Sequence, residues 1–176
     1  EFIAMPGHKG LYGPQGTGVL LCGKDVETAT LLEGGTGSMS LQQAMPDFLP
    51  DRLEAGTHNM PGIAGLLAGV RFVRSRGEGA ICRHERLLAL AAAEGLRRLP
   101  GVRVYARPDL ADQTGVVSFT AEGQEPESLA AALAERDIAV RAGLHCAPLA
   151  HRTAGTVDTG TVRASFSHWN TPEEVG

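Results

Sequence analysis

The segment MPGHKGLYGPQGTG, residues 5–18, constrains this chain most strongly, because it contains five glycines and two prolines. Glycine lets the main chain form turns that other residues resist and lets it approach another group closely. Apolar runs flank the segment, at residues 2–5 before it and at residues 19–21 after it. We therefore predict two short buried strands joined by a tight loop that presents His8 and Lys9.

Neither of the common phosphate-binding glycine patterns fits this loop. A P-loop lysine follows a glycine and precedes serine or threonine, whereas Lys9 follows His8 and precedes Gly10. The dinucleotide pattern G-x-G-x-x-G fails because the pair Gly16 and Gly18 is followed by an apolar run. Spacing alone leaves two interpretations open, a plain turn before a strand or a lysine with a different chemistry.

The composition is that of an ordinary globular chain of one or two domains. The 176 residues are 43% hydrophobic and 20% charged. The net charge of −4 gives no basic footprint for nucleic acid, and no apolar run is long enough to span a membrane. Three cysteines form an odd number, which argues against a disulfide framework and favours a reducing cytoplasm.

Hydrophobic periodicity divides the chain near residues 75–80. The first part combines the two strands with a long irregular segment at 33–59 and a glycine-studded helix at 61–75. The second part alternates, with helices predicted at 77–99 and 126–136, strands at 102–105, 115–119, 138–141 and 161–169, and a loop at 142–160. This order predicts a small α+β domain, with helices on one face of a mainly antiparallel sheet.

Both ends of the sequence read as interrupted elements. The chain begins inside an apolar run, and residues 170–175 begin a helix with a polar N-cap, a proline and acidic residues in the first turn. We therefore expect the chain to be a piece of a longer protein.

A second informative segment is VRAGLHCAPLAHRT, residues 140–153, which places Cys146 on a loop with glycine and proline. Two histidines and two arginines lie around it, and positive charge with partial exposure favours a thiolate. The alternative is a buried, inert cysteine beside a solvated basic face. Zinc binding by His145, Cys146 and His151 is a weaker alternative, because no second Cys/His pair has zinc spacing. The other two cysteines, at a strand end and within a helix, are predicted to be structural.

Five segments, in order, resemble the pyridoxal-phosphate-dependent cysteine desulfurases of the class V aminotransferase group: GHKGLYGPQGTG, EGGTGS, PDRLEAGTHNMPGIAG, VRAGLHCAPLAH and TVRASFSHWNT. The resemblance extends over essentially the whole chain. It implies an α/β, PLP-transferase-like fold of the aspartate aminotransferase kind, fold type I. Residues 1–76 would be the C-terminal part of the large cofactor-binding domain, incomplete here, and residues 77–176 the small C-terminal α+β domain with the cysteine loop.

The resemblance also implies the catalytic and substrate-binding residues. Lys9 matches the lysine that forms a Schiff base with the cofactor, a role that suits a lysine whose free amine is exposed by desolvation or a neighbouring cation. Cys146 matches the cysteine that carries the persulfide. Arg163 matches the arginine that holds the substrate carboxylate with its planar fork, and Arg141 would assist it.

Residues at the cofactor phosphate follow from the same resemblance. His8 matches a residue near the phosphate, while Thr57 and the loop around Gly35 match groups that reach the cofactor of the other subunit in a homodimer. Pro6 departs from the family pattern, which has serine or threonine there. Proline offers neither that hydroxyl nor a backbone N–H, so one phosphate contact is in doubt.

The implied activity is removal of sulfur from L-cysteine, leaving L-alanine, with a sulfur-acceptor protein as a further partner. A selenocysteine lyase or another class V enzyme is the nearest alternative, and a non-catalytic fragment is an alternative of a different kind. In the family, the residues that stack on the cofactor ring and pair with its nitrogen precede the lysine. We therefore expect this piece alone to be inactive and without bound cofactor, and we expect no metal, nucleic acid or membrane partner.

Overall fold

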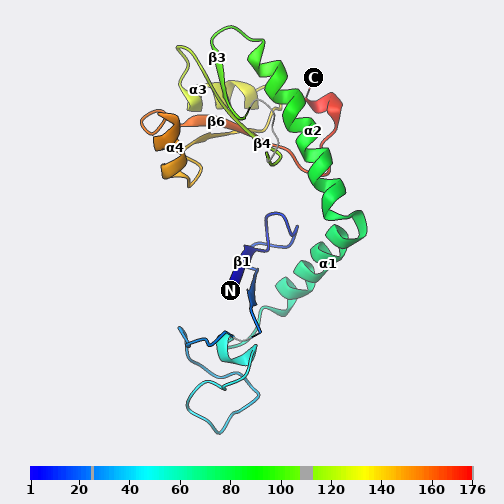
Figure 1. The fold of residues 1–176 in the computed structure, drawn as a ribbon, viewed down its shortest axis with the longest axis vertical. Helices are drawn as coiled ribbons and strands as arrows, with labels where there is room; N and C mark the ends of the chain where they lie inside the picture. The colour runs from blue at the N-terminus through cyan, green and yellow to red at the C-terminus, as the bar shows by residue number, and fades with distance from the viewer. Residues whose placement is uncertain (25, 108–112, 176) are drawn as a thin grey trace. The chain divides into compact units, whose positions relative to one another are not determined.

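The computed structural model describes residues 1–24, 26–107 and 113–175. It separates into two compact units, Glu1–Arg76 and Gly77–Gly176, which Figure 1 shows in blue to cyan and in green to red. No helix in the described residues is long and apolar enough to cross a membrane.

The first unit is built on a hairpin. Strand β1 (Phe2–Pro6) pairs antiparallel with β2 (Gly18–Cys22), so that Pro6 lies opposite Gly18. The prediction that these strands are buried is wrong for this chain, because side chains such as Ile3 are 57% exposed. A two-stranded sheet offers neither strand a second neighbour, and such a hairpin is marginally stable alone.

Helix α1 (Met60–Arg76) packs against the loop that joins the two strands, and its glycines permit the close approach. A side chain at Gly69 would collide with the carbonyl oxygen of Leu11. The ring of Phe72 lies edge-on to that of Tyr12, with 5.5 Å between their centroids. The helix is therefore present as predicted, and its small residues hold the loop that carries Lys9.

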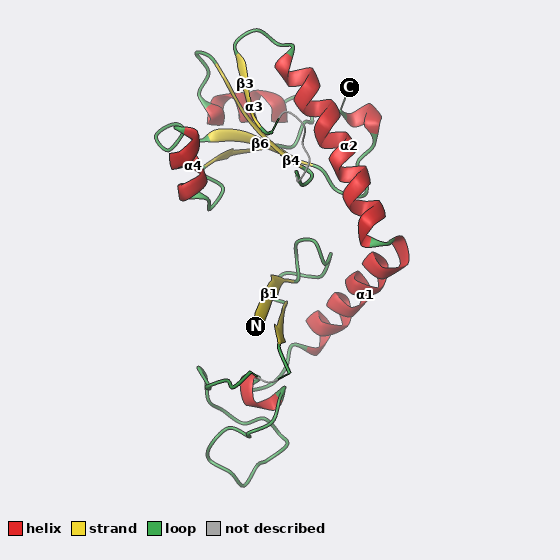
Figure 2. Cartoon of the chain, viewed as in Figure 1, coloured by secondary structure: helices red, strands yellow, loops and turns green. Residues whose placement is uncertain are grey.

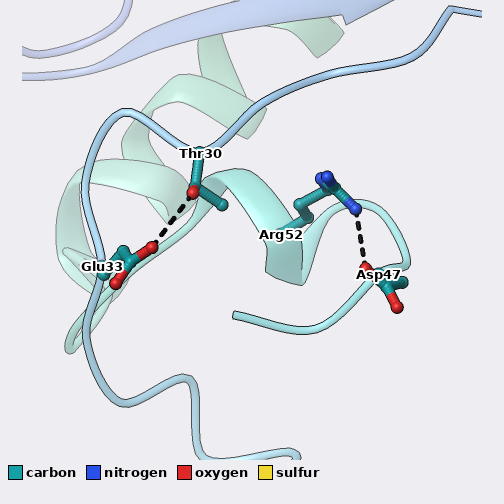
Figure 3. A network of polar contacts seen from close by, with 4 residues as sticks. All are labelled: Thr30, Glu33, Asp47 and Arg52. Carbon is teal, nitrogen blue, oxygen red and sulfur yellow. Dashed lines mark hydrogen bonds and ion pairs between the residues drawn. The ribbon is translucent and has the colours of Figure 1, made fainter. Parts of the chain in front are cut away.

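The segment between β2 and α1 is irregular, as predicted, except for the short 3-10 helix η1 (Asp51–Leu53). Figure 3 shows two of its polar contacts. The Arg52 guanidinium binds Asp47 at 2.9 Å, and the Thr30 hydroxyl donates to Glu33 at 3.3 Å. Ion pairs with an exposed partner contribute little to stability, so these contacts order the loop only weakly.

The second unit contains a four-stranded antiparallel sheet in the order β3-β4-β6-β5 (Figure 2). Its strands are β3 (Val102–Tyr105), β4 (Val116–Ala121), β5 (Arg141–Gly143) and β6 (Thr161–Ser165). Helix α2 (Glu78–Arg97) contacts β3 and β4, and α3 (Pro126–Ala134) contacts β5 and β6. The predicted antiparallel sheet with packed helices is therefore present.

The core of this unit lies between α2 and the sheet. Ala89 and Ala93 of α2 and Val117 of β4 are fully buried. Half-buried apolar residues surround them, namely Leu90, Leu96, Val104, Ala106 and Phe166. The side chains of these two alanines are small, so the helix lies close to the sheet.

Five predictions for the second unit need correction. The strand predicted at 138–141 begins at Arg141, and the strand predicted at 161–169 ends at Ser165. The predicted loop 142–160 contains the helix α4 (Pro148–Ala154), and the C-terminal helix is the 3-10 turn η2 (Pro172–Glu174). The helices also do not share one face, because α4 lines a cavity with side chains of the sheet face opposite Val117.

The signals for α4 were present in the sequence. Pro148 occupies the first turn, where a missing N–H costs nothing, and Gly155 ends the helix in the left-handed conformation at φ 70°. The helix is only seven residues long. Such a short segment shows too little hydrophobic periodicity to stand out from a loop.

Candidate functional site

Lys9 lies on a loop that the main chain closes on itself. The N–H of Gly7 donates to the carbonyl of Thr17 at 2.8 Å, and the N–H of Gly13 donates to the carbonyl of Gly7 at 2.7 Å. The carbonyl of Lys9 accepts from the N–H of Tyr12 at 2.9 Å. Gly7 is buried, and any side chain there would collide with the Thr17 hydroxyl group. The glycines therefore make a tight loop rather than a flexible one.

The amine of Lys9 is available for chemistry. Lys9 and His8 are both exposed, and no ion pair joins Lys9 to another residue in the described part of the chain. Pro6 is the last residue of β1 and offers no N–H towards the loop. The loop thus presents one primary amine beside one imidazole.

Thr57 and Gly35, the two residues assigned to a phosphate in the partner subunit, lie on neighbouring loops. The N–H of Gly56 donates to the carbonyl of Gly35 at 2.9 Å, which brings the two loops together. Both candidate residues are exposed. The structure therefore joins two segments that are about twenty residues apart in the sequence into one exposed, hydroxyl-bearing surface.

Cys146 lies on an exposed turn between β5 and α4, which agrees with its predicted position on a loop. The turn is left-handed at two successive residues, with φ 52° at His145 and 60° at Cys146. It is closed by a hydrogen bond from the N–H of Ala147 to the carbonyl of Leu144, at 2.9 Å. The thiol is therefore accessible and held by a defined backbone.

Two arginines face each other beside this turn. Arg141 on β5 pairs directly with Arg163 on β6, so both side chains project from the same face of the sheet. Arg163 also pairs with Ser118, on the face opposite the core residue Val117. Like charges directly opposite each other are unfavourable, and an anion bound between them would remove that cost.

Arg163 retains unused hydrogen-bonding capacity. Its Nε atom is buried and has no hydrogen-bond partner among the described residues. A buried donor without a partner is costly, and a bound carboxylate would satisfy it. The prediction that Arg163 and Arg141 act together agrees with their placement, while their function stays a prediction.

Two histidines complete this polar region. His145 is half-buried, and burial is the main cause that lowers the pKa of its imidazole below the usual 6.5. The Thr161 carbonyl raises this pKa, and Arg163, His151 and Arg141 lower it again. His151 of α4 is buried and its Nδ1 lies 2.8 Å from the Thr156 hydroxyl.

The two imidazole rings lie 5.8 Å apart between centroids. A cavity of about 260 Å³ separates α4 from the polar face of the sheet, with Ser118, His151 and Thr161 among its lining residues. No group of three or more His, Cys, Asp or Glu side chains in the described residues could hold a metal ion.

The other two cysteines differ from each other. Cys22 ends β2 and is half-buried, whereas Cys82 of α2 is exposed, with its sulfur 3.9 Å from the Arg86 guanidinium. Cys82 is therefore not a core residue, and its structural role stays a prediction. Its exposed thiol makes it a useful reference for the reactivity of Cys146.

Comparison with known proteins places this arrangement in a family. The aminotransferase class-V model matches residues 1–176. The chain belongs to the aminotransferase class-V family. A probable cysteine desulfurase of Pyrococcus abyssi is 40% identical over 99% of this chain and 44% of its own length. The chain thus spans less than half the length of that relative.

Solved structures agree with this membership and confirm the predicted fold. The cysteine desulfurase of Thermococcus onnurineus NA1, solved in its apo form, is 39% identical with a TM-score of 0.87, over 99% of this chain and 44% of its own. The cysteine desulfurase CsdA (S-sulfonic acid) of Escherichia coli is 32% identical with a TM-score of 0.85, over 99% and 43%. The class V relationship inferred from the five segments is therefore correct.

Two features of the site were not visible in the sequence. The strand register sets Arg141 opposite Arg163, which lies 22 residues further along the chain. His145 reaches Thr161, 16 residues further along the chain. The only local signal for the latter was the position of His145 next to Cys146.

Proposed function

We propose that these residues are the C-terminal part of a pyridoxal-phosphate-dependent cysteine desulfurase that converts L-cysteine to L-alanine. The observation that carries this proposal is the exposed Cys146 turn beside the paired arginines, in a chain whose relatives and structural neighbours are named cysteine desulfurases. Cys146 supplies a nucleophilic sulfur, and the paired arginines supply a site for an amino-acid carboxylate.

The residues present fit pyridoxal phosphate. Lys9 offers an unpaired amine on a rigid loop, and the buried Gly7 leaves no room for a side chain beneath that loop. The exposed loops of Gly35 and Thr57 offer backbone N–H groups and a hydroxyl of the kind that binds phosphate. When bound, the cofactor supplies an electron sink for bond changes at the substrate α-carbon.

Lys9 and Arg163 act on the substrate before sulfur moves. The Lys9 amine would hold the cofactor, and its Nζ atom would take the proton from the substrate α-carbon. The Arg163 guanidinium binds the substrate carboxylate through two parallel N–H donors. Arg141, exposed on the neighbouring strand, adds positive charge at the same face.

Cys146 then accepts the sulfur. Its thiolate attacks the substrate sulfur, which forms an S–S bond and breaks the bond from sulfur to the β-carbon. The electron pair of the broken bond stays with the β-carbon, which is protonated to become the methyl group of alanine. Cys146 is left as a persulfide, and attack by a thiol of an acceptor protein on its outer sulfur regenerates the thiol.

Further parts of the proposal concern the whole protein. We infer a homodimer, in which Thr57 and Gly35 reach the cofactor of the partner subunit, and a cytoplasmic location with neither nucleic acid nor membrane as partner. His8 lies beside the cofactor phosphate in this proposal. Selenocysteine, whose selenium is larger and more polarisable than sulfur, would bind to the same residues.

The test compares two serine variants of the whole protein. Cys146→Ser should abolish sulfur transfer from L-cysteine while the visible absorbance of the cofactor bound through Lys9 persists, because a hydroxyl is a poor nucleophile towards sulfur. Cys82→Ser, also at an exposed position, should transfer sulfur normally. Normal transfer in Cys146→Ser, or loss confined to Cys82→Ser, would contradict the assignment. Comparing L-cysteine with L-selenocysteine in the same assay decides between the two substrates.

A further inference from the structure

We propose that His145 is a positioning residue for Cys146, because its imidazole fastens the turn that carries the thiol to Thr161 at the start of β6. This inference rests on the proposed function. In this proposal, His145 holds the Cys146 turn in place and does not promote ionisation of the thiol.

The fastening is a hydrogen bond with a defined direction. Nε2 of His145 lies 3.1 Å from the carbonyl oxygen of Thr161 and 3.3 Å from its hydroxyl oxygen. A carbonyl oxygen only accepts, so Nε2 carries the hydrogen and donates it. Nδ1 of His145 is buried and has no partner in the described part of the chain, so no other contact competes for the ring orientation.

The anchor point is a rigid part of the sheet. Thr161 is only 2% exposed, and it pairs with Gly143 across β5 and β6. Gly160 packs so closely on Gly143 that an added Cβ would lie 2.9 Å from the Gly143 Cα. Movement of Thr161 would therefore require the two strands to separate.

The Cys146 turn needs such an anchor. His145 and Cys146 both adopt the left-handed conformation, which disfavours residues with a Cβ. Within the turn itself, the bond from Ala147 to Leu144 is the closing hydrogen bond. Without the bond to Thr161, the turn would exchange with extended conformations in which the thiol points elsewhere.

The surroundings keep the anchor neutral. Burial lowers the pKa of His145, and the positive Arg163 and Arg141 and the neighbouring His151 lower it further, against the opposing effect of the Thr161 carbonyl. A neutral imidazole does not form an ion pair with the thiolate. His145 therefore supplies geometry and no charge.

The anchor also links the nucleophile to the substrate clamp. Thr161 and Arg163 lie on β6 two residues apart, so their side chains share one face of the strand. The bond from His145 thus fixes Cys146 relative to the strand whose arginine binds the carboxylate. Its loss should reduce the frequency of productive attack more than the affinity for substrate.

Three variants of the whole protein separate this role from general stability. His145→Leu fills the space without a donor, and His145→Gln retains an N–H donor at the reach of Nε2. The matched control is His84→Leu, because Nε2 of His84 also bonds a backbone carbonyl, that of Asn170 at 2.9 Å, in the same unit. Thermal unfolding is recorded for each variant to confirm that it is folded.

The first readout is independent of turnover. Hydrogen exchange of the Ala147 amide, which closes the turn, should accelerate about fivefold in His145→Leu, the effect of losing one net hydrogen bond. The rate of Cys146 alkylation should change in the same variant while its dependence on pH stays that of the wild type, with the exposed Cys82 as an internal reference. His145→Gln should restore both, and His84→Leu should alter neither.

The second readout is catalytic. In His145→Leu, kcat for sulfur transfer should fall about tenfold while KM changes less than about twofold, with an unchanged cofactor spectrum. Unchanged Ala147 exchange, or a Gln variant no better than Leu, would overturn the inference. If His145→Leu does not fold, the ring ¹⁵N signals of wild-type His145 decide, since a proton on Nδ1 alone excludes the anchor. Sulfur transfer by Cys146→Ser would instead refute the proposed function and leave the exchange measurement valid.

Discussion

Replacing Gly69 by alanine should loosen the loop that carries Lys9. The added Cβ would collide with the Leu11 carbonyl oxygen and would lie 2.9 Å from the Tyr12 carbonyl carbon and 3.0 Å from its oxygen. All three are backbone atoms of the Lys9 loop, so no side chain can move aside. Either α1 or the loop must shift.

The magnitude follows from two opposing effects. Alanine in place of glycine stabilises a helix interior by about 1 kcal/mol. Overpacking a tight contact costs about 1–3 kcal/mol, and contact with three backbone atoms places this site in the upper part of that range. The net expectation for Gly69→Ala is a loss of about 1–2 kcal/mol in the free energy of unfolding.

A second glycine serves as the control, because its replacement by alanine should raise the free energy of unfolding. Gly95 lies inside α2, and nothing lies within 4 Å of a Cβ built there. Gly95→Ala should therefore add about 0.5–1 kcal/mol of stability. The two variants make the same chemical change in a helix interior and differ only in the space available.

The assay is denaturant unfolding of the whole protein followed by circular dichroism, combined with titration by pyridoxal phosphate. Gly69→Ala should lower the unfolding midpoint and weaken cofactor binding through Lys9, and Gly95→Ala should raise the midpoint without affecting the cofactor. If Gly69→Ala stabilised the protein as much as Gly95→Ala, the close packing of α1 on the Lys9 loop would be refuted.

Three further predictions concern the site. Lys9→Ala should remove both the visible absorbance of the bound cofactor and all turnover, while Lys24→Ala, at the only other lysine, should keep both; retained turnover in the first would reject the assignment. Arg163→Lys should raise KM for L-cysteine about tenfold, since an ammonium cannot reproduce the bidentate fork, and an unchanged KM would exclude a carboxylate contact. Because the pKa of His145 is lowered below 6.5, its neutral form stabilises the fold fully above that pH. The stability of wild type relative to His145→Gln should therefore fall as the pH drops from 6.5 towards the lower pKa of the folded state, and a difference independent of pH would contradict this.

Local patterns in the sequence determined the three longer helices, most of the strands and the position of the two reactive segments. The apolar and alanine-rich stretch at 78–97 forms a helix because its apolar positions recur on one side. Cys146 lies on a turn because glycine and proline flank it within a few residues. Information of this kind is contained in short windows, and the resemblance of five such windows sufficed to identify the family.

Contacts between distant residues were decided only by the tertiary structure. Whether an apolar strand is buried depends on what covers it, so the exposure of Ile3 could not follow from its hydrophobicity. The facing pair Arg141 and Arg163 depends on strand register, and a shift by one residue would turn Arg163 to the core face. The bond from His145 to Thr161 exists because β5 and β6 pair at Gly143, which brings together residues separated by a helix and two turns.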